Sequence, residues 1–242
     1  MDVVISQDQQ VVVSHDPWLS ARLGLDAKGE RIDPRTEQQV RLYAMPYAEI
    51  RQCALGVFPH PHFPEQQAVR THRPLLREVL AATTFACQQL KRPLVRYSVE
   101  LKSDPAGDGI LQPLPAHFVE LVVGELELQQ ATNRTTLLSF DPRILQAIRC
   151  TAPRQPVCYL LEAVRSLSQL FYQLGFIPDV FGPAQWLLTA EMLDFLRTQY
   201  AGMLLVPWTI NSEAELLSAL TWQVDGITTD YPDRLINLMT KV

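Results

Sequence analysis

Residues 135–161 read TTLLSFDPRILQAIRCTAPRQPVCYLL, a stretch that contains one βα unit followed by the next strand. The short apolar runs at 135–140 and 157–161 are typical of strands that are covered on both faces of a sheet. Between them, Asp141 offers an N-cap oxygen and Pro142 suits the first helical position, ahead of apolar residues at helical spacing. The stretch therefore predicts an α/β fold with a parallel sheet.

The same alternation continues on both sides of this unit. Further strands are predicted at 94–102, 179–181, 203–208 and 226–228. A helix is predicted to begin at Pro74, and another after the capping box formed by Ser212 and Glu215. Gly175 and Gly202 each follow an apolar helical stripe, where a helix would end in a left-handed residue.

The N-terminal third differs from the rest of the chain. Two short strands are predicted at 3–6 and 11–14, and the polar residues 7–10 between them predict a hairpin or a tight connection. Residues 17–72 are rich in proline, charge and histidine and show only weak periodicity. We interpret this segment as an insertion over one end of a barrel, within a single domain that spans residues 1–242.

Composition excludes several classes of protein. With 242 residues, 47% of them apolar, the chain can bury a substantial core. A net charge of −5 with 19% charged residues argues against a nucleic-acid-binding surface, and no apolar run is long enough to span a membrane. Four separated cysteines without a CxxC pair predict free thiols, which favour a reducing compartment only weakly and leave open whether the soluble protein is cytoplasmic or exported.

Chemistry-bearing residues lie at the ends of three predicted strands. His15 and Asp16 end the run VVVSHDP at 11–17, where a general acid or base would lie in an α/β barrel, although the histidine could equally sit in a turn that Asp16 caps. Glu100 and Lys102 lie two apart, so they point the same way; they form either a buried ion pair or a site for a metal and a phosphate. Trp208 in the run VPWTIN either packs or contacts a ligand.

Taken in order, these stretches resemble the glycerophosphodiester phosphodiesterase family. DVVISQD at 2–8 with VVVSHD at 11–16 resembles the family's strand, turn and "V-V-x-H-D" stretch. The other matching stretches are RPLLREVL at 73–80 for "P-T-L-E-E-V-L", VELK at 99–102 for "I-E-I-K", SF at 139–140 for "S-F", and WTIN at 208–211 with VDGITTDYP at 224–232 for "W-T-V-N … V-D-G-I-I-T-D-Y-P". The last of these is specific, and the matches cover most of the chain.

The resemblance implies a TIM (β/α)₈-type barrel with an inserted segment, about 17–72, after the second strand. It implies metal-dependent hydrolysis of a small glycerophosphodiester to an alcohol and glycerol 3-phosphate, as in phospholipid degradation. By the same resemblance, Asp2 and Glu100 are ligands of a divalent cation, Ca²⁺ or Mg²⁺, and His15 is one of a catalytic histidine pair. Lys102 would hold the phosphate, and Trp208 would line the pocket near the leaving group.

The sequence also departs from the family pattern. Family members open with a strand that carries His-Arg-Gly, a Pro-Glu-Asn-Thr helix start, and an acidic residue two positions before the one that Asp2 matches; none of these occurs here. We therefore expect a barrel that lacks its first strand and helix. Loss of one acid/base group costs about a hundredfold to ten-thousandfold in rate, so the chain alone is expected to be weakly active or inactive. The alternative is a non-catalytic relic or phosphate-binding module. The alcohol, the choice of cation and the oligomeric state stay open.

Overall fold

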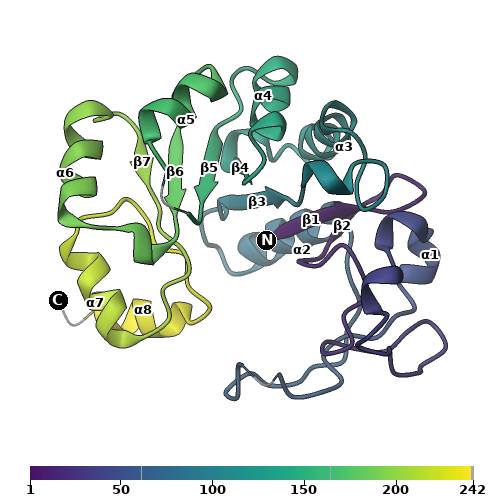
Figure 1. Ribbon diagram of the computed structural model, residues 1–242. Coiled ribbons are helices and arrows are strands. Elements are labelled where there is room, and N and C mark those ends of the chain that lie inside the picture. The colour runs from purple at the N-terminus through teal and green to yellow at the C-terminus, as the bar shows by residue number, and fades with distance from the viewer. Residues whose placement is uncertain (61, 164, 241–242) are drawn as a thin grey trace. The chain divides into compact units, whose positions relative to one another are not determined.

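The computed structural model describes residues 1–60, 62–163 and 165–240 (Figure 1). The chain divides into two compact units. The first unit comprises Met1–Leu137 and Ala147–Gln155, and the second comprises Leu138–Gln146 and Pro156–Val242. Within the described residues, no helix is both long enough and apolar enough to cross a membrane.

The first unit contains three strands in the order β2-β1-β3. Strands β1 (Asp2–Ile5) and β2 (Val11–Val13) form an antiparallel hairpin, which confirms the predicted connection. Strand β3 (Tyr97–Leu101) runs parallel to β1, with Asp2 beside Glu100. It begins three residues later than the apolar run at 94–102 indicated. In Figure 1 the purple hairpin lies next to teal β3.

Two longer helices belong to the first unit. Helix α2 (Leu76–Gln89) begins where the Glu78 carboxylate accepts a hydrogen bond of 2.9 Å from the Leu75 N–H, close to the predicted start at Pro74. Helix α3 (Pro115–Leu128) begins with proline at its first position. The shorter helical turns are η1 (Glu37–Gln39), η2 (Leu42–Ala44), α1 (Tyr47–Ile50), η3 (Pro105–Gly107) and η4 (Thr132–Arg134).

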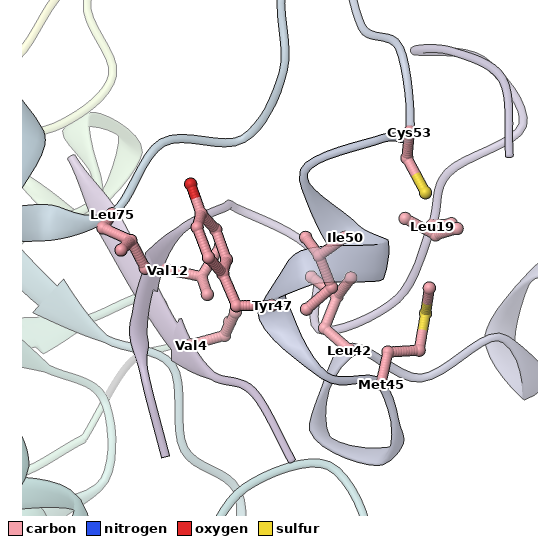
Figure 2. Close-up of a cluster of buried hydrophobic side chains, with 9 residues drawn as sticks. All are labelled: Val4, Val12, Leu19, Leu42, Met45, Tyr47, Ile50, Cys53 and Leu75. Atoms are coloured by element: carbon pink, nitrogen blue, oxygen red, sulfur yellow. The ribbon is translucent and has the colours of Figure 1, made fainter. Parts of the chain in front are cut away.

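Residues 17–72 contain little regular structure, but they build a core of their own (Figure 2). Val4 and Val12 of the hairpin form one side of this core. The other members are Leu19, Leu42, Met45, Tyr47, Ile50, Cys53 and Leu75. Each of these side chains is at most 8% exposed, so apolar burial holds the segment against the hairpin despite its weak periodicity.

The second unit contains the parallel strands β5 (Val157–Leu161), β6 (Val180–Pro183) and β7 (Leu204–Leu205), in that order. All five residues of β5 are buried, as the apolar run indicated. Its helical elements are α5 (Leu167–Leu174), η5 (Gln185–Leu187), α6 (Ala190–Gln199), α7 (Glu213–Thr221) and α8 (Pro232–Met239).

Strand β4 (Thr135–Ser139) and helix α4 (Pro142–Thr151) are each divided between the two units. The Asp141 carboxylate accepts a hydrogen bond of 3.0 Å from the Arg143 N–H, which confirms the predicted N-cap of α4. The strands and intervening helices of both units confirm the α/β class predicted from the βα pattern.

The predicted helix ends were partly correct. The capping box at Ser212 and Glu215 is present, and Gly175 ends α5 in the left-handed conformation with φ 86°. The prediction for Gly202 was wrong, because α6 already ends at Gln199 and Tyr200 is its C-cap. The aromatic ring of Tyr200 packs edge-on against Phe171, which gives that position a role in packing.

Two strand predictions in the C-terminal region also need correction. Strand β7 covers two residues instead of the six expected at 203–208, although the N–H groups of Val206 and Trp208 still donate to the C=O groups of Phe181 and Pro183. Residues 226–228 do not form a strand. The Thr228 N–H and C=O nevertheless bond to the backbones of Pro207 and Ile210, so this stretch still runs beside the segment that follows β7.

Candidate functional site

Three charged side chains gather where β1 and β3 lie side by side. The parallel register pairs Asp2 with Glu100, so both carboxylates are on the same face of the sheet. Lys102 Nζ lies 2.8 Å from Glu100 Oε1 and 3.6 Å from Asp2 Oδ1. The structure thus brings together three of the residues that the sequence singled out, although they are separated by about a hundred positions in the chain.

Burial makes this cluster electrostatically demanding. The Glu100 side chain is 14% exposed, and this desolvation raises the pKa of its carboxyl to about 7. The Lys102 ammonium opposes that rise in pKa, and the neighbouring Asp2 carboxylate adds to it. Two adjacent carboxylates share one ammonium, an arrangement that favours a further cation.

The donor chemistry of the cluster suits a hard divalent cation. Among the described residues, no group of three or more His, Cys, Asp or Glu side chains is arranged to hold a metal ion. Asp2 and Glu100 offer two carboxylate groups, and Ca²⁺ or Mg²⁺ completes its coordination with waters and substrate oxygens in many proteins. The two residues fit a cation of this kind as a partial protein site.

His15 lies at the end of the hairpin and belongs to the same charged region. The Ser14 N–H donates to the Asp2 C=O at 3.0 Å, which fixes the end of β2 beside β1. His15 Nδ1 lies 2.8 Å from Asp16 Oδ1, and this hydrogen bond raises the pKa of His15 and lowers that of Asp16. Charges on Asp2 and Lys102 also act on the pKa of His15. The His15 side chain is 71% exposed and so is accessible to a ligand.

Trp208 belongs to the second unit, whereas Asp2, His15, Glu100 and Lys102 belong to the first. Its indole N–H donates to the Gly182 C=O at 2.8 Å. The ring packs edge-on against Phe140 at 5.3 Å and against Trp186 at 5.9 Å, measured between ring centroids. Phe140, Trp186 and Trp208 follow β4, β6 and β7, so three aromatic rings gather at the carboxyl ends of these strands.

Sequence reasoning missed two residues near these groups. Trp186 is 66% exposed, and its position just after a strand was the available signal. Arg73 is 2% exposed and its guanidinium reaches Ser14, next to His15. The contact of Arg73 with Ser14 could not be predicted from the sequence, because it joins positions 59 residues apart.

Comparison with known proteins decides the family. The model of the glycerophosphoryl diester phosphodiesterase family matches residues 1–234. This chain belongs to that family. The resemblance read from the motifs is thereby confirmed, and with it the class of enzyme.

Relatives of this phosphodiesterase chain share about a quarter of its residues. A glycerophosphodiester phosphodiesterase of Bacillus subtilis (strain 168) is 26% identical over 239 residues, which are 96% of this chain and 73% of the relative. A glycerophosphodiester phosphodiesterase of Bacillus altitudinis is 25% identical over 242 residues, covering 98% of this chain and 84% of the relative.

Solved structures agree with this family membership. A crystal structure of a glycerophosphoryl diester phosphodiesterase from Silicibacter pomeroyi DSS-3 superposes with a TM-score of 0.83 at 27% identity, covering 99% of this chain and 82% of that one. An Oleispira antarctica phosphodiesterase, solved with the product sn-glycerol-3-phosphate, has a TM-score of 0.71 at 19% identity, with 99% and 83% covered. The second likeness shows the fold alone. The structural relatives are TIM barrels, and this phosphodiesterase chain shares their α/β fold with a parallel sheet.

Proposed function

We propose that this phosphodiesterase chain hydrolyses glycerophosphodiesters to an alcohol and glycerol 3-phosphate with the help of a divalent cation. The observation that carries the proposal is the cluster of Asp2, Glu100 and Lys102, with His15 close enough for its pKa to respond to two of these charges. The product-bound phosphodiesterase of Oleispira antarctica supports the choice of substrate class.

In this proposal Asp2 and Glu100 hold Ca²⁺ or Mg²⁺. When bound, the cation would supply positive charge next to the phosphate oxygens, where negative charge develops during displacement. The two carboxylates bind the cation through hard oxygen atoms, and burial of Glu100 makes its charge costly without a positive neighbour.

Lys102 holds the phosphate of the substrate. Its ammonium is a compact point charge with three donors, and within the described part of the chain it forms ion pairs with the carboxylates of Asp2 and Glu100. A phosphodiester repels nucleophiles through its own negative charge, so an ammonium at this position lowers the barrier to attack.

His15 moves a proton at Nε2. Asp16 accepts a hydrogen bond from Nδ1, which sets the tautomer and leaves Nε2 for the reaction. At Nε2 the ring either takes a proton from the attacking oxygen, of a water or the neighbouring glycerol hydroxyl, or protonates the departing alcohol. In the second unit, the Trp208 ring is fixed by its hydrogen bond to the Gly182 C=O, and the proposed role of this ring is to contact the leaving group.

The rate of this chain alone is a further part of the proposal. The sequence contains no His-Arg-Gly stretch, from which family members take the second histidine of the pair. We expect the 242-residue chain to release product slowly, by about a hundredfold to ten-thousandfold relative to an enzyme with both proton-transfer groups.

The test is release of glycerol 3-phosphate from glycerophosphocholine with Ca²⁺, Mg²⁺ or EDTA. The proposal expects slow, metal-dependent release by the wild type, none in EDTA and none from His15→Ala. Arg77→Met, which removes an arginine that pairs with Glu125 on α3, is the matched control and should keep the wild-type rate. A folded, metal-supplied protein that binds added glycerol 3-phosphate but releases none from glycerophosphocholine would be a phosphate-binding module. That result would contradict the proposed activity.

A further inference from the structure

Arg73 is a charged residue in the first unit that the proposed chemistry does not use. It is 2% exposed, and its Nε–H donates to Ser14 Oγ at 3.1 Å. Burial lowers the pKa of its guanidinium, so the protein holds a cation in an unfavourable environment. Because burial of this charge is unfavourable, we expect Arg73 to have a role other than packing.

The backbone fixes Arg73 opposite Ser14. Val12 and Leu75 form an antiparallel bridge, and the Val13 N–H donates to the Pro74 C=O at 2.9 Å. In this register Val13 pairs with Pro74 and Ser14 pairs with Arg73, so the side chains of Ser14 and Arg73 project from the same face. The Tyr47 hydroxyl also donates to the Arg73 C=O at 3.1 Å, which holds that backbone from the other side.

Hydrogen-bond chemistry then gives the contact a direction. A guanidinium can only donate, so Ser14 Oγ accepts from Arg73 and its single proton is left for another acceptor. That acceptor is the Asp16 C=O, at 2.7 Å from Ser14 Oγ. Arg73 therefore fixes the rotation of the Ser14 hydroxyl, and the hydroxyl fixes the backbone of Asp16.

The last link joins Asp16 to His15. Asp16 Oδ1 lies 2.8 Å from His15 Nδ1, and the Asp16 side chain is 20% exposed. In the histidine ring, the nitrogen that carries the proton is set by the partner of the other nitrogen. The contacts thus run without a break from Arg73 through Ser14 and Asp16 to His15.

We propose that Arg73 is a positioning residue that acts through Ser14 to hold Asp16 against Nδ1 of His15. This role rests on the proton transfer at Nε2 of His15 proposed above. Loss of the contact would let the Asp16 carboxylate move away, and His15 would then sample both neutral tautomers.

The charged and titratable groups around this turn are consistent with the role. The charge of the Asp16 carboxylate raises the pKa of Arg73, and the charge of Arg22 lowers the pKa of Asp16. Cys53 faces Arg73 as well, but burial raises the pKa of its thiol to about 11, so it is neutral near pH 7. Around His15, the nearby charges are Asp2, Asp16 and Lys102.

The test is ¹⁵N NMR of the histidine rings, which reports the tautomer of His15 without any turnover. The wild type is expected to show Nδ1–H, and Ser14→Ala and Arg73→Met are each expected to shift His15 to a mixture of tautomers. Ser14→Thr keeps the hydroxyl and should restore the wild-type signal. Ser6→Ala, at a buried serine near the opposite end of the hairpin, is the matched control and should leave His15 unchanged.

Kinetics add a second readout. Ser14→Ala should lower kcat by roughly 10- to 100-fold, as loss of a supporting hydrogen bond does at other sites, while KM changes by about twofold or less. If Arg73→Met fails to fold, comparing the His15 tautomer in Ser14→Ala with that in Ser14→Thr still tests the positioning role. An Nδ1–H signal that persists in folded Ser14→Ala overturns the proposal. A shifted tautomer in a protein that releases no product would uphold the positioning role and contradict the proposed activity alone.

Discussion

Leu42 provides a direct test of the core that residues 17–72 build around the hairpin. Its side chain is 0% exposed and belongs to the cluster of Figure 2, which also contains Val4 and Val12 of the hairpin. The substitution Leu42→Ala removes three carbon atoms from this cluster and leaves a cavity. The hairpin that carries His15 would lose part of its support.

The expected cost follows from that burial. Leu→Ala substitutions at fully buried sites cost about 2–5 kcal/mol, and the lower values occur where neighbours can move into the cavity. Ala27, Ile32 and Val40 are partly buried and border this cluster, so some collapse is expected. We predict a loss of about 2–3 kcal/mol in the free energy of unfolding, which corresponds to a melting temperature lower by roughly 4–12 °C for a chain of this length.

Urea unfolding followed by circular dichroism measures the loss. Leu90→Ala is the matched control, because Leu90 follows α2 in the same unit and is 66% exposed. Its free energy of unfolding should change by about 0.5 kcal/mol or less. A loss for Leu42→Ala under about 1 kcal/mol, or equal losses for the two variants, would refute the reasoning that this segment is held by a buried core.

Three further predictions concern single groups. Asp16→Asn should lower the free energy of unfolding more at about pH 5.5 than at about pH 8.5. The pKa of His15 is raised in the folded protein, so its charged pair with Asp16 stabilises the fold below the pKa of the unfolded chain and is lost as the pH rises through the pKa of the folded protein. Urea titrations at both pH values would show this difference. Native protein treated with a thiol reagent should be labelled at exposed Cys150 and not at buried Cys53, as peptide mapping can check; rapid labelling of Cys53 would contradict its burial. Gly182→Ala should lose about 1–3 kcal/mol, since a Cβ there would lie 2.7 Å from Leu160 Cδ2, whereas Gly124→Ala on α3 meets no atom within 4 Å and should gain about 0.5–1 kcal/mol.

The second unit was the easier part to predict from the sequence. Strand β5 has the bounds that the run at 157–161 indicated, because five consecutive apolar residues have few alternatives to a buried strand. The Asp141 cap and the capping box at Ser212 are local signals, and both are present. The prediction of a strand at 226–228 was wrong. Pairing of this stretch depends on the neighbouring segment, where Pro207 has no N–H to donate to a ladder of hydrogen bonds.

The core under residues 17–72 could not be predicted in the same way. Its members come from segments without a repeating apolar pattern, and the cluster joins residues that are distant in the chain, such as Val12 and Leu42. Periodicity reports only which face of a regular element is buried. A segment folded by long-range contacts gives no such signal.

The candidate site likewise combines residues that a local sequence pattern predicts with residues that only long-range pairing brings in. Glu100 and Lys102 share a face because strand side chains alternate, which the sequence alone indicates. Asp2 joins them through the parallel register of β1 with β3, which was not predicted; only the family resemblance had grouped Asp2 with Glu100. Arg73 depends on a second register, set by the bridge between Val12 and Leu75, and no local pattern encodes it.

The central claim is that Asp2, Glu100 and Lys102 bind a phosphate together with a divalent cation. Calorimetric titration with sn-glycerol 3-phosphate, in Ca²⁺ or Mg²⁺ and again in EDTA, tests it without requiring turnover. We predict that binding needs the cation and is weakened about tenfold or more in Lys102→Met, whereas Arg77→Met binds as the wild type does. Equal affinity in Lys102→Met and wild type, or equal affinity with and without EDTA, would contradict a joint site for phosphate and cation at these residues.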